Sequence, residues 1–373
     1  MKICIISDFF IPHYNGGGER RYYEIAKRLV EKGHSVDLLC MKIQGVNSTE
    51  TIDGINVYHI GPTIRKPPYR NLFDFIYFIL AAFWWIIKHD YAVIDAQTYA
   101  PLIPGFFAAK IKGIKVVGTI HDVSSLGTDQ WLIFPGLASL LEKILVIIPF
   151  NKIITVSNST RKALIEYYGV NPKRIQLVHN GVDLEFIDSL KVDEKYENSI
   201  IYVGRLAPHK HVDDLIYALK ILKNEISNIK LRIVGNGIEK DNLTKLVTKL
   251  GLEKNVEFLG ELDYKNVIME IKKSNVLVLP STREGFGMVL AEAGACNVPV
   301  IAYRTGGVVE VVEDGKNGFL VESHNIDVLT EKIQFFLFNN DISNQMGSYG
   351  YQRVKNFFKW DGIVNTLIKI YRD

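Results

Sequence analysis

The sequence has few cysteines, almost no net charge and no long uncharged apolar run. Its three cysteines, Cys4, Cys40 and Cys296, stand far apart without metal-ligand spacing, which argues against a disulfide framework and a cysteine-based zinc site and fits a reducing cytosol. Lysine and arginine total 44 against 41 acidic residues, so charge gives no argument for a nucleic-acid-binding protein. With 47% hydrophobic and 23% charged residues, the composition excludes a disordered or collagen-like chain.

No stretch reaches the roughly 18 uncharged apolar residues that predict a membrane span, and the apolar run at residues 1–8 is too short for a secretory signal. Two segments come close, Phe75–Ile87 and Trp131–Phe150. They predict either buried helices of an α/β domain or helices that lie partly in a bilayer interface. In the second case their aromatic rings and the upstream Arg65, Lys66 and Arg70 would meet the headgroups.

The 373 residues exceed the roughly 250–300 at which one core stops growing, so two domains are expected. Short β-branched runs alternate with helical patterns (residues 19–32, 212–223 and 240–250) in both halves. The predicted strands are 2–7, 35–41, 57–60, 92–96, 115–119 and 152–156, then 199–203, 231–234, 256–259, 276–279 and 298–301. This alternation predicts two Rossmann-like, doubly wound α/β domains that face a central cleft, with ligands at the carboxyl ends of the strands.

A charged segment at residues 183–198 suits a linker between these halves. We therefore expect a first domain over residues 1–185, a second over 186–350 and a closing segment over 351–373.

Three glycines, Gly16, Gly17 and Gly18, separate the first strand from the first helix. Glycines at such a turn let the backbone approach an anion, and the helix N-terminus adds partial positive charge. The spacing is neither that of a dinucleotide fingerprint nor that of a P-loop, so a purely structural turn is an equally good interpretation.

Two cations, Arg205 and Lys210, follow the strand at 199–203 on a loop that begins with Gly204. Either could be a solvated surface charge. Together on a loop that opens a helix they fit better as a clamp on a diphosphate, because arginine offers a planar fork and lysine a compact charge.

Two glutamates lie in the stretch 280–293, which follows the strand at 276–279 and opens a helix near Gly287. Glu284 falls on the loop, and Glu292 falls within the helix among small apolar residues. A buried carboxylate is costly without a partner, and it can accept from two adjacent sugar hydroxyls at once. We expect such a role for both, with solvent exposure as the alternative.

These motifs occur in the order typical of one family. The sequence resembles the retaining nucleotide-sugar glycosyltransferases of family 4, which have the GT-B fold. The residues that carry the resemblance are 16–20, His121-Asp122, Val156-Ser157, 179–183, 203–210, 234–237, the Glu284/Glu292 pair and a last helix with Trp360 and Tyr371. That helix is similar to the family's closing segment, which crosses back to the first domain.

The resemblance assigns the donor to the second domain and the acceptor to the first. It implies that Arg205 and Lys210 bind the donor diphosphate, that Glu284 accepts from the donor sugar, and that Glu292 accepts from the ribose. The base would rest near residues 256–260.

The remaining implied contacts come from backbone groups and one histidine. Amides of Phe286, Gly287 and Met288 would contact the sugar and phosphate, and Gly17 and Gly18 would approach the diphosphate from the first domain. His121 would lie near the anomeric centre, through its ring or its carbonyl. The catalytic set is then His121, Arg205, Lys210 and Glu284.

The expected function is retaining transfer of a hexose from a nucleotide diphosphate sugar, with UDP favoured by family frequency, to a glycan or lipid-linked glycan. No cofactor and no metal is expected, because Arg205 and Lys210 take the electrostatic role of a metal ion. We expect peripheral membrane contact through Phe75–Ile87 on the cytoplasmic face, and no nucleic-acid partner. Front-face attack and a covalent intermediate stay open, with Asp122 as the nearest nucleophile.

Two other functions share this architecture. They are nucleotide-sugar epimerisation or hydrolysis, and a non-catalytic nucleotide-sugar-binding subunit. The joint presence of Arg205, Lys210, Glu284 and Glu292 argues against the second, since a binder could lose any of them.

Overall fold

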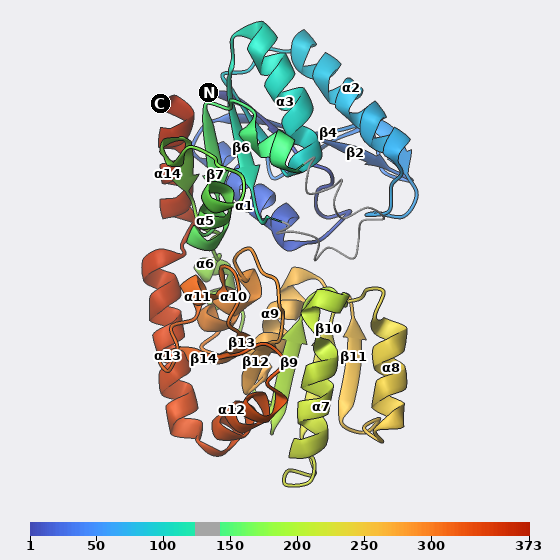
Figure 1. Cartoon of the computed structure of the whole chain (residues 1–373), viewed down its shortest axis with the longest axis vertical. Coiled ribbons are helices and arrows are strands. Elements are labelled where there is room, and N and C mark those ends of the chain that lie inside the picture. The colour runs from blue at the N-terminus through green and yellow to red at the C-terminus, as the bar shows by residue number, and fades with distance from the viewer. Residues whose placement is uncertain (124–141) are drawn as a thin grey trace. The chain divides into compact units, whose positions relative to one another are not determined.

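The computed structural model of the chain describes residues 1–123 and 142–373. It divides into two compact units (Figure 1): the first comprises residues 1–180 and 360–373, and the second comprises residues 181–359. The divisions fall at 180/181 and 359/360, five and nine residues from the 185/186 and 350/351 that the charge pattern and motifs indicate.

The first unit contains an eight-stranded sheet in the order β3-β4-β2-β1-β5-β6-β7-β8. All pairs are parallel except β3 with β4. The strands are β1 Lys2–Ile6, β2 Ser35–Ile43, β3 Thr49–Ile52, β4 Ile55–Ile64, β5 Val93–Gln97, β6 Lys115–Ile120, β7 Lys152–Thr155 and β8 Ile175–Leu177. The order reverses between β1 and β5, which places a topological switch point at their carboxyl ends.

The helices α1 Gly17–Glu31, α2 Leu72–Lys88, α3 Tyr99–Lys112, α5 Asn158–Glu166 and α14 Trp360–Arg372 belong to this unit. A capping box between Asn71 and Asp74 starts α2, whose buried residues Phe78, Ala82 and Ile86 follow a spacing of four. The segment Phe75–Ile87 is thus a helix with one face in the core. In Trp131–Phe150, residues 131–141 lie outside the described part and residues 142–147 are helical.

The last helix completes the first unit. α14 packs against α1, and the Tyr371 hydroxyl donates to Asp95, a buried residue of β5 that also accepts from Thr119 at 2.9 Å. The Lys115 ammonium donates to the Tyr371 carbonyl at 3.1 Å.

The second unit contains a six-stranded, wholly parallel sheet in the order β11-β10-β9-β12-β13-β14. Its strands are β9 Ser199–Val203, β10 Lys230–Val234, β11 Val256–Gly260, β12 Val276–Leu279, β13 Val300–Tyr303 and β14 Gly318–Val321. Its helices are α6 Leu184–Ser189, α7 Val212–Leu222, α8 Lys240–Lys249, α9 Tyr264–Lys273, α10 Met288–Ala295, α11 Val308–Val311, α12 Ile326–Phe338 and α13 Asn340–Phe357. Here the order reverses between β9 and β12.

Most predicted strands differ from the observed ones at one end or both, and two local differences have a clear physical reason. The predicted strand at 298–301 is β13 at Val300–Tyr303, because Pro299 has no N–H for the sheet. The predicted linker at 183–198 contains α6, whose first turn is capped by Asp183 accepting from the Phe186 amide at 3.0 Å.

Candidate active site

In the second unit, the loops that leave β9 and β12 flank the switch point. They bring Lys210 and Glu284 into an ion pair, with Nζ and Oε1 2.5 Å apart. The two side chains are only 16% and 14% exposed. The cation expected at the phosphate and the carboxylate expected at the sugar therefore contact each other directly, a pairing that spacing along the chain does not indicate.

Hydrogen bonds hold these two loops together. The His209 carbonyl accepts from the Thr282 amide at 2.9 Å and from the Ser281 hydroxyl at 3.2 Å. The Gly307 amide donates to the Glu284 carbonyl at 2.9 Å, and a Cβ at Gly307 would lie 2.2 Å from the Gly285 carbonyl oxygen. Only glycine fits there, so the loop that carries Glu284 is fixed by close backbone packing.

Arg205 lies on the same loop as Lys210 but is exposed. The loop's shape is set by Tyr202, whose hydroxyl donates to the Arg205 carbonyl at 3.0 Å. The guanidinium therefore stands at the surface of the β9 loop, whereas the Lys210 ammonium is largely covered.

Helix α10 begins directly after the Glu284 loop. Gly287 precedes it with φ of +85°, a left-handed conformation that favours glycine. The Phe286 ring is buried and contacts Phe358 edge-on with ring centroids 5.3 Å apart, so it anchors the loop. Glu292, one turn into α10, is 8% exposed, and the expectation of a buried carboxylate there agrees with the structure.

In the first unit, His121 follows β6 next to the switch point between β1 and β5. Its Nε2 atom lies 3.0 Å from the Tyr22 hydroxyl of α1 and 3.2 Å from Gln97 Oε1 at the end of β5. The Tyr22 and His121 rings meet edge-on with centroids 5.2 Å apart. Three elements thus fix the imidazole.

Burial, together with the nearby charge of Arg21, lowers the pKa of His121 to about 3. The ring is therefore neutral at pH 7. Both of its contacts, with the Tyr22 hydroxyl and with Gln97 Oε1, are made by Nε2.

The glycine loop of residues 16–18 lies next to Tyr22. α1 begins at Gly17 after Gly16, which gives no side-chain cap to the first amides. A Cβ at Gly18 would lie 3.1 Å from the Tyr22 oxygen, so the loop backbone lies close to Tyr22, which contacts His121.

Arg21, which the sequence did not single out, is 1% exposed. Its guanidinium donates to the carbonyls of His179 at 2.9 Å and Val178 at 3.2 Å, and to Asn180 Oδ1 at 2.6 Å. These acceptors immediately precede the division at 180/181. Arg21 therefore ties the helix behind the glycine loop to the end of the first unit.

Tyr22 and Gln97 were also missed. The spacing of Tyr22 indicates only a helix face, but a polar Gln97 at the carboxyl end of a buried parallel strand is a signal that could have been used.

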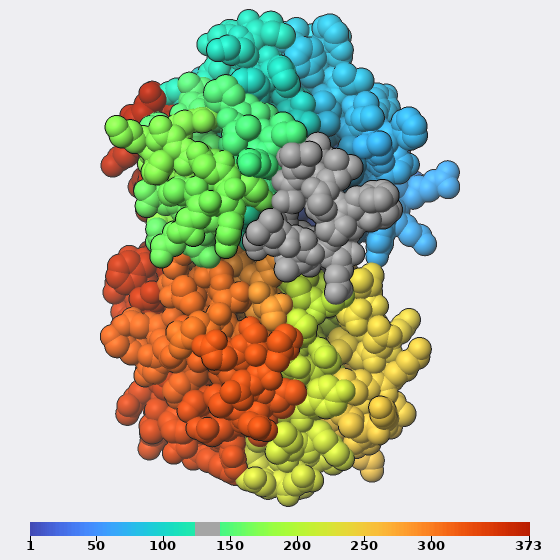
Figure 2. Space-filling view, viewed as in Figure 1, coloured from blue at the N-terminus to red at the C-terminus, as the bar shows by residue number. Residues whose placement is uncertain are grey.

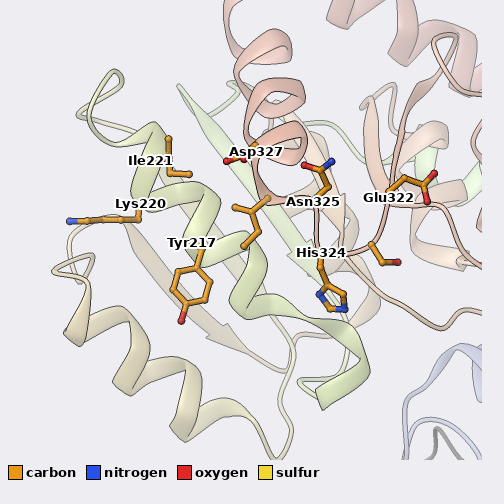
Figure 3. Close-up of a pocket in the computed structure, with 9 residues that line it drawn as sticks. Tyr217, Lys220, Ile221, Glu322, His324, Asn325 and Asp327 are labelled. Atoms are coloured by element: carbon orange, nitrogen blue, oxygen red, sulfur yellow. The ribbon is translucent and has the colours of Figure 1, made fainter.

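A cavity of about 870 Å³ lies elsewhere in the second unit, between α7 and the start of α12 (Figure 3). It contains none of the predicted site residues. Tyr217, Lys220 and Ile221 line it from α7, opposite residues 322–327. Within the described ranges, two groups of two histidines and one carboxylate could hold a metal ion, and neither includes a predicted site residue.

The helices of residues 1–123 and 142–373 include none with the length and apolarity needed to cross a bilayer.

Comparisons with known proteins agree with this architecture. Residues 15–186 match the family described as Glycosyltransferase Family 4, and residues 185–353 match Glycosyl transferases group 1. N-acetyl-alpha-D-glucosaminyl L-malate synthase of Bacillus anthracis is 31% identical over 270 residues, which cover 70% of this chain and 68% of that protein.

Two solved structures share the fold over the whole chain. Sucrose-phosphate synthase from Thermosynechococcus elongatus superposes with a TM-score of 0.87 at 22% identity, covering 100% of this chain and 98% of that one. HepE of Anabaena, crystallised with UDP-glucose, superposes with a TM-score of 0.79 at 20% identity, covering 99% and 98%.

Proposed function

Because the chain belongs to the glycosyltransferases of family 4, which have the GT-B fold, we propose that it is a retaining transferase that moves a hexose from a UDP-sugar to a glycan or lipid-linked glycan. The observation that carries this proposal is the Lys210–Glu284 pair at the switch point of the second unit. The reaction uses no cofactor and no metal ion.

Lys210 and Arg205 hold the donor diphosphate. An ammonium has three donors, so Lys210 keeps Glu284 and still bonds a phosphate oxygen, while the exposed Arg205 adds a planar fork. The amides of Phe286, Gly287 and Met288 at the start of α10 add donors and partial positive charge. Negative charge that develops on the leaving diphosphate meets groups already in place, which is the largest contribution to many enzymatic accelerations.

The two glutamates read the hydroxyls of the donor. Glu284, held by Lys210, accepts from the sugar, and Glu292 accepts from the ribose. The base lies near β11 (Val256–Gly260). The complex of HepE with UDP-glucose supports uracil as that base.

The first unit supplies Gly17 and Gly18 to the diphosphate and His121 to the sugar. A neutral imidazole does not repel the positive charge that develops on an oxocarbenium-like sugar. This supports a contact of the His121 ring with the sugar near the anomeric carbon.

The outer face of α2 is the proposed contact with a membrane that carries the acceptor. Its large apolar side chains follow helical spacing, and Figure 2 shows this segment in light blue on the outside of the first unit. The exposed members are Leu72, Phe73, Ile76, Tyr77, Leu80 and Trp84. Exposed Arg65 and Lys66 precede the helix and suit anionic headgroups of the cytoplasmic leaflet.

Flotation with anionic liposomes tests the membrane contact. Trp84 is 57% exposed, whereas the Trp85 indole donates to the Tyr91 hydroxyl at 3.0 Å and stacks on His89. Trp84→Ala should reduce flotation, and Trp85→Ala, the matched control, should reduce it less. A chain that stays in the aqueous fraction with these liposomes contradicts the peripheral contact.

Transfer itself is tested with radiolabelled UDP-sugars and a lipid extract as the acceptor pool. We expect labelled glycolipid, with the α-configuration of the donor kept when the product is analysed by NMR. Release of free sugar alone would indicate a hydrolase, and donor binding without turnover would indicate a binding subunit.

A further inference from the structure

A cluster of two histidines and a glutamate lies in the first unit, apart from the residues proposed to act on the donor. β3 pairs with β4 so that Glu50 is opposite Val57, which places Glu50 and His59 on one face of the sheet. His13 reaches them from the loop between β1 and α1. Glu50 Oε1 lies 2.8 Å from Nε2 of His13 and 2.8 Å from Nε2 of His59.

The three side chains converge closely enough to share one metal ion. Imidazole nitrogens and carboxylate oxygens bind Zn²⁺ at about 2.0–2.2 Å in a tetrahedral shell, so its ligand atoms are about 3.3–3.6 Å apart and the 2.8 Å contacts would open slightly on binding. The three ligand atoms all lie within 4.8 Å of one another. Two imidazoles and one carboxylate are a donor set that first-row transition metals accept.

The surroundings of His59 also favour a metal ion. His59 is 2% exposed, and its Nδ1 lies 3.3 Å from the Met41 carbonyl oxygen. Metal-binding histidines typically donate their second ring N–H to such a carbonyl. With that hydrogen on Nδ1, the lone pair of Nε2 faces Glu50 Oε1, and one metal ion can bind both atoms.

The second His₂-carboxylate group, His211, Asp214 and His324 in the second unit, differs. Asp214 Oδ2 already accepts from the Tyr303 hydroxyl at 2.7 Å and from His324 Nδ1 at 2.9 Å. The His324 side chain is 53% exposed. Asp214 is thus held by a donor outside its group, the Tyr303 hydroxyl, so the second group serves as an internal control.

We propose that His13, Glu50 and His59 bind one divalent transition-metal ion of the Zn²⁺ class, with water in the remaining coordination positions. The ion links the loop of residues 8–16, which leads into α1, to the edge strands β3 and β4. Its role is structural and includes no step of sugar transfer, so the inference is independent of the proposed function.

Equilibrium dialysis of the full chain against Zn²⁺, followed by elemental analysis, tests this site. We expect one Zn²⁺ per chain, no comparable uptake of Mg²⁺, and at least about 100-fold weaker Zn²⁺ binding in His13→Gln, because loss of an outer-shell partner alone costs 10- to 100-fold. His324→Gln should bind Zn²⁺ like the unchanged chain. Zn²⁺ should raise the Tm of the unchanged chain but not that of His13→Gln.

His59→Gln gives a second variant, and circular dichroism checks its fold. Co²⁺ provides a separate readout, since its visible absorption reports nitrogen and oxygen ligands and should disappear in His13→Gln. Failure of the unchanged chain to take up Zn²⁺, or loss of Zn²⁺ in His324→Gln but not in His13→Gln, would overturn the proposal.

Discussion

The two switch points have the same topology but opposite chemistry. In the second unit the strand-end loops carry charge, with Lys210 paired to Glu284 and Arg205 exposed beside them. In the first unit the centre is the neutral His121, held by the uncharged Tyr22 and Gln97. The comparison teaches that the fold sets where ligands bind, while the side chains at the strand ends decide whether that place favours an anionic diphosphate or a neutral sugar.

Removing the Lys210 cation should reduce activity most strongly. Lys210→Ala should lower kcat by about 10²–10³-fold, because a preorganised donor to developing charge is lost. Its Tm should also fall, because Glu284, which is 14% exposed, loses its partner at a cost of about 1–3 kcal/mol, but the chain should stay folded at the assay temperature. Steady-state kinetics and a thermal melt measure both. Lys220→Ala, which removes a lysine of α7 that donates to the Leu250 carbonyl, is the control. If Lys210→Ala is unfolded at the assay temperature and this alone explains its loss of activity, Lys210 is structural.

Neutralising the carboxylate should have the next largest effect. Glu284→Gln keeps the side-chain shape but loses a charge-assisted bond, so kcat/KM for the donor should fall about 10- to 100-fold. The control is Glu322→Gln, at an exposed residue paired with Arg304. An unchanged kcat/KM in Glu284→Gln would show that the carboxylate does not bind the donor.

Changes around the neutral His121 should lower activity less. Tyr22→Phe removes one hydrogen bond to His121 and should lower kcat about 2- to 10-fold. Tyr23→Phe, on the same helix, removes a hydroxyl bonded to Asp53 instead and should leave kcat unchanged. If the two variants behave alike in kinetic assays, Tyr22 does not position His121 for catalysis.

The smallest effect concerns pH and stability. His121 has a pKa of about 3 in the folded chain and about 6.5 when unfolded, so between these values the unfolded chain binds the extra proton. His121 therefore contributes stability above pH 6.5 that is lost as pH falls toward 3. Comparing Tm from pH 7 to pH 5 in the unchanged chain and in His121→Asn should show a shallower decline in the variant. Parallel curves would contradict the lowered pKa of His121.

Prediction from the sequence was most accurate for strands that are continuous apolar runs. Strands β9 and β12 agree residue for residue with the predicted 199–203 and 276–279. β3 is polar and β8 has three residues, so neither carries a hydrophobic signal, and both depend on pairing with a neighbouring strand.

Candidate site residues could be found where a charged or small residue follows a strand, as for Lys210 and Glu284. The ion pair between these two residues, which are 74 positions apart, could not be predicted. Nor could the contacts of Arg21, whose partners lie 157 to 159 residues away. Spacing shows which residues reach the strand ends, and tertiary packing alone decides which of them meet.

The return of α14 to the first unit has a consequence for synthesis on the ribosome. Residues 181–359 are contiguous, so the second unit can assemble as soon as they emerge, whereas the first must wait for residues 360–373 and for Tyr371 to reach Asp95. The unit whose synthesis begins first is thus completed last. A fragment that ends at residue 180 would lack α14, the final helix of the first unit.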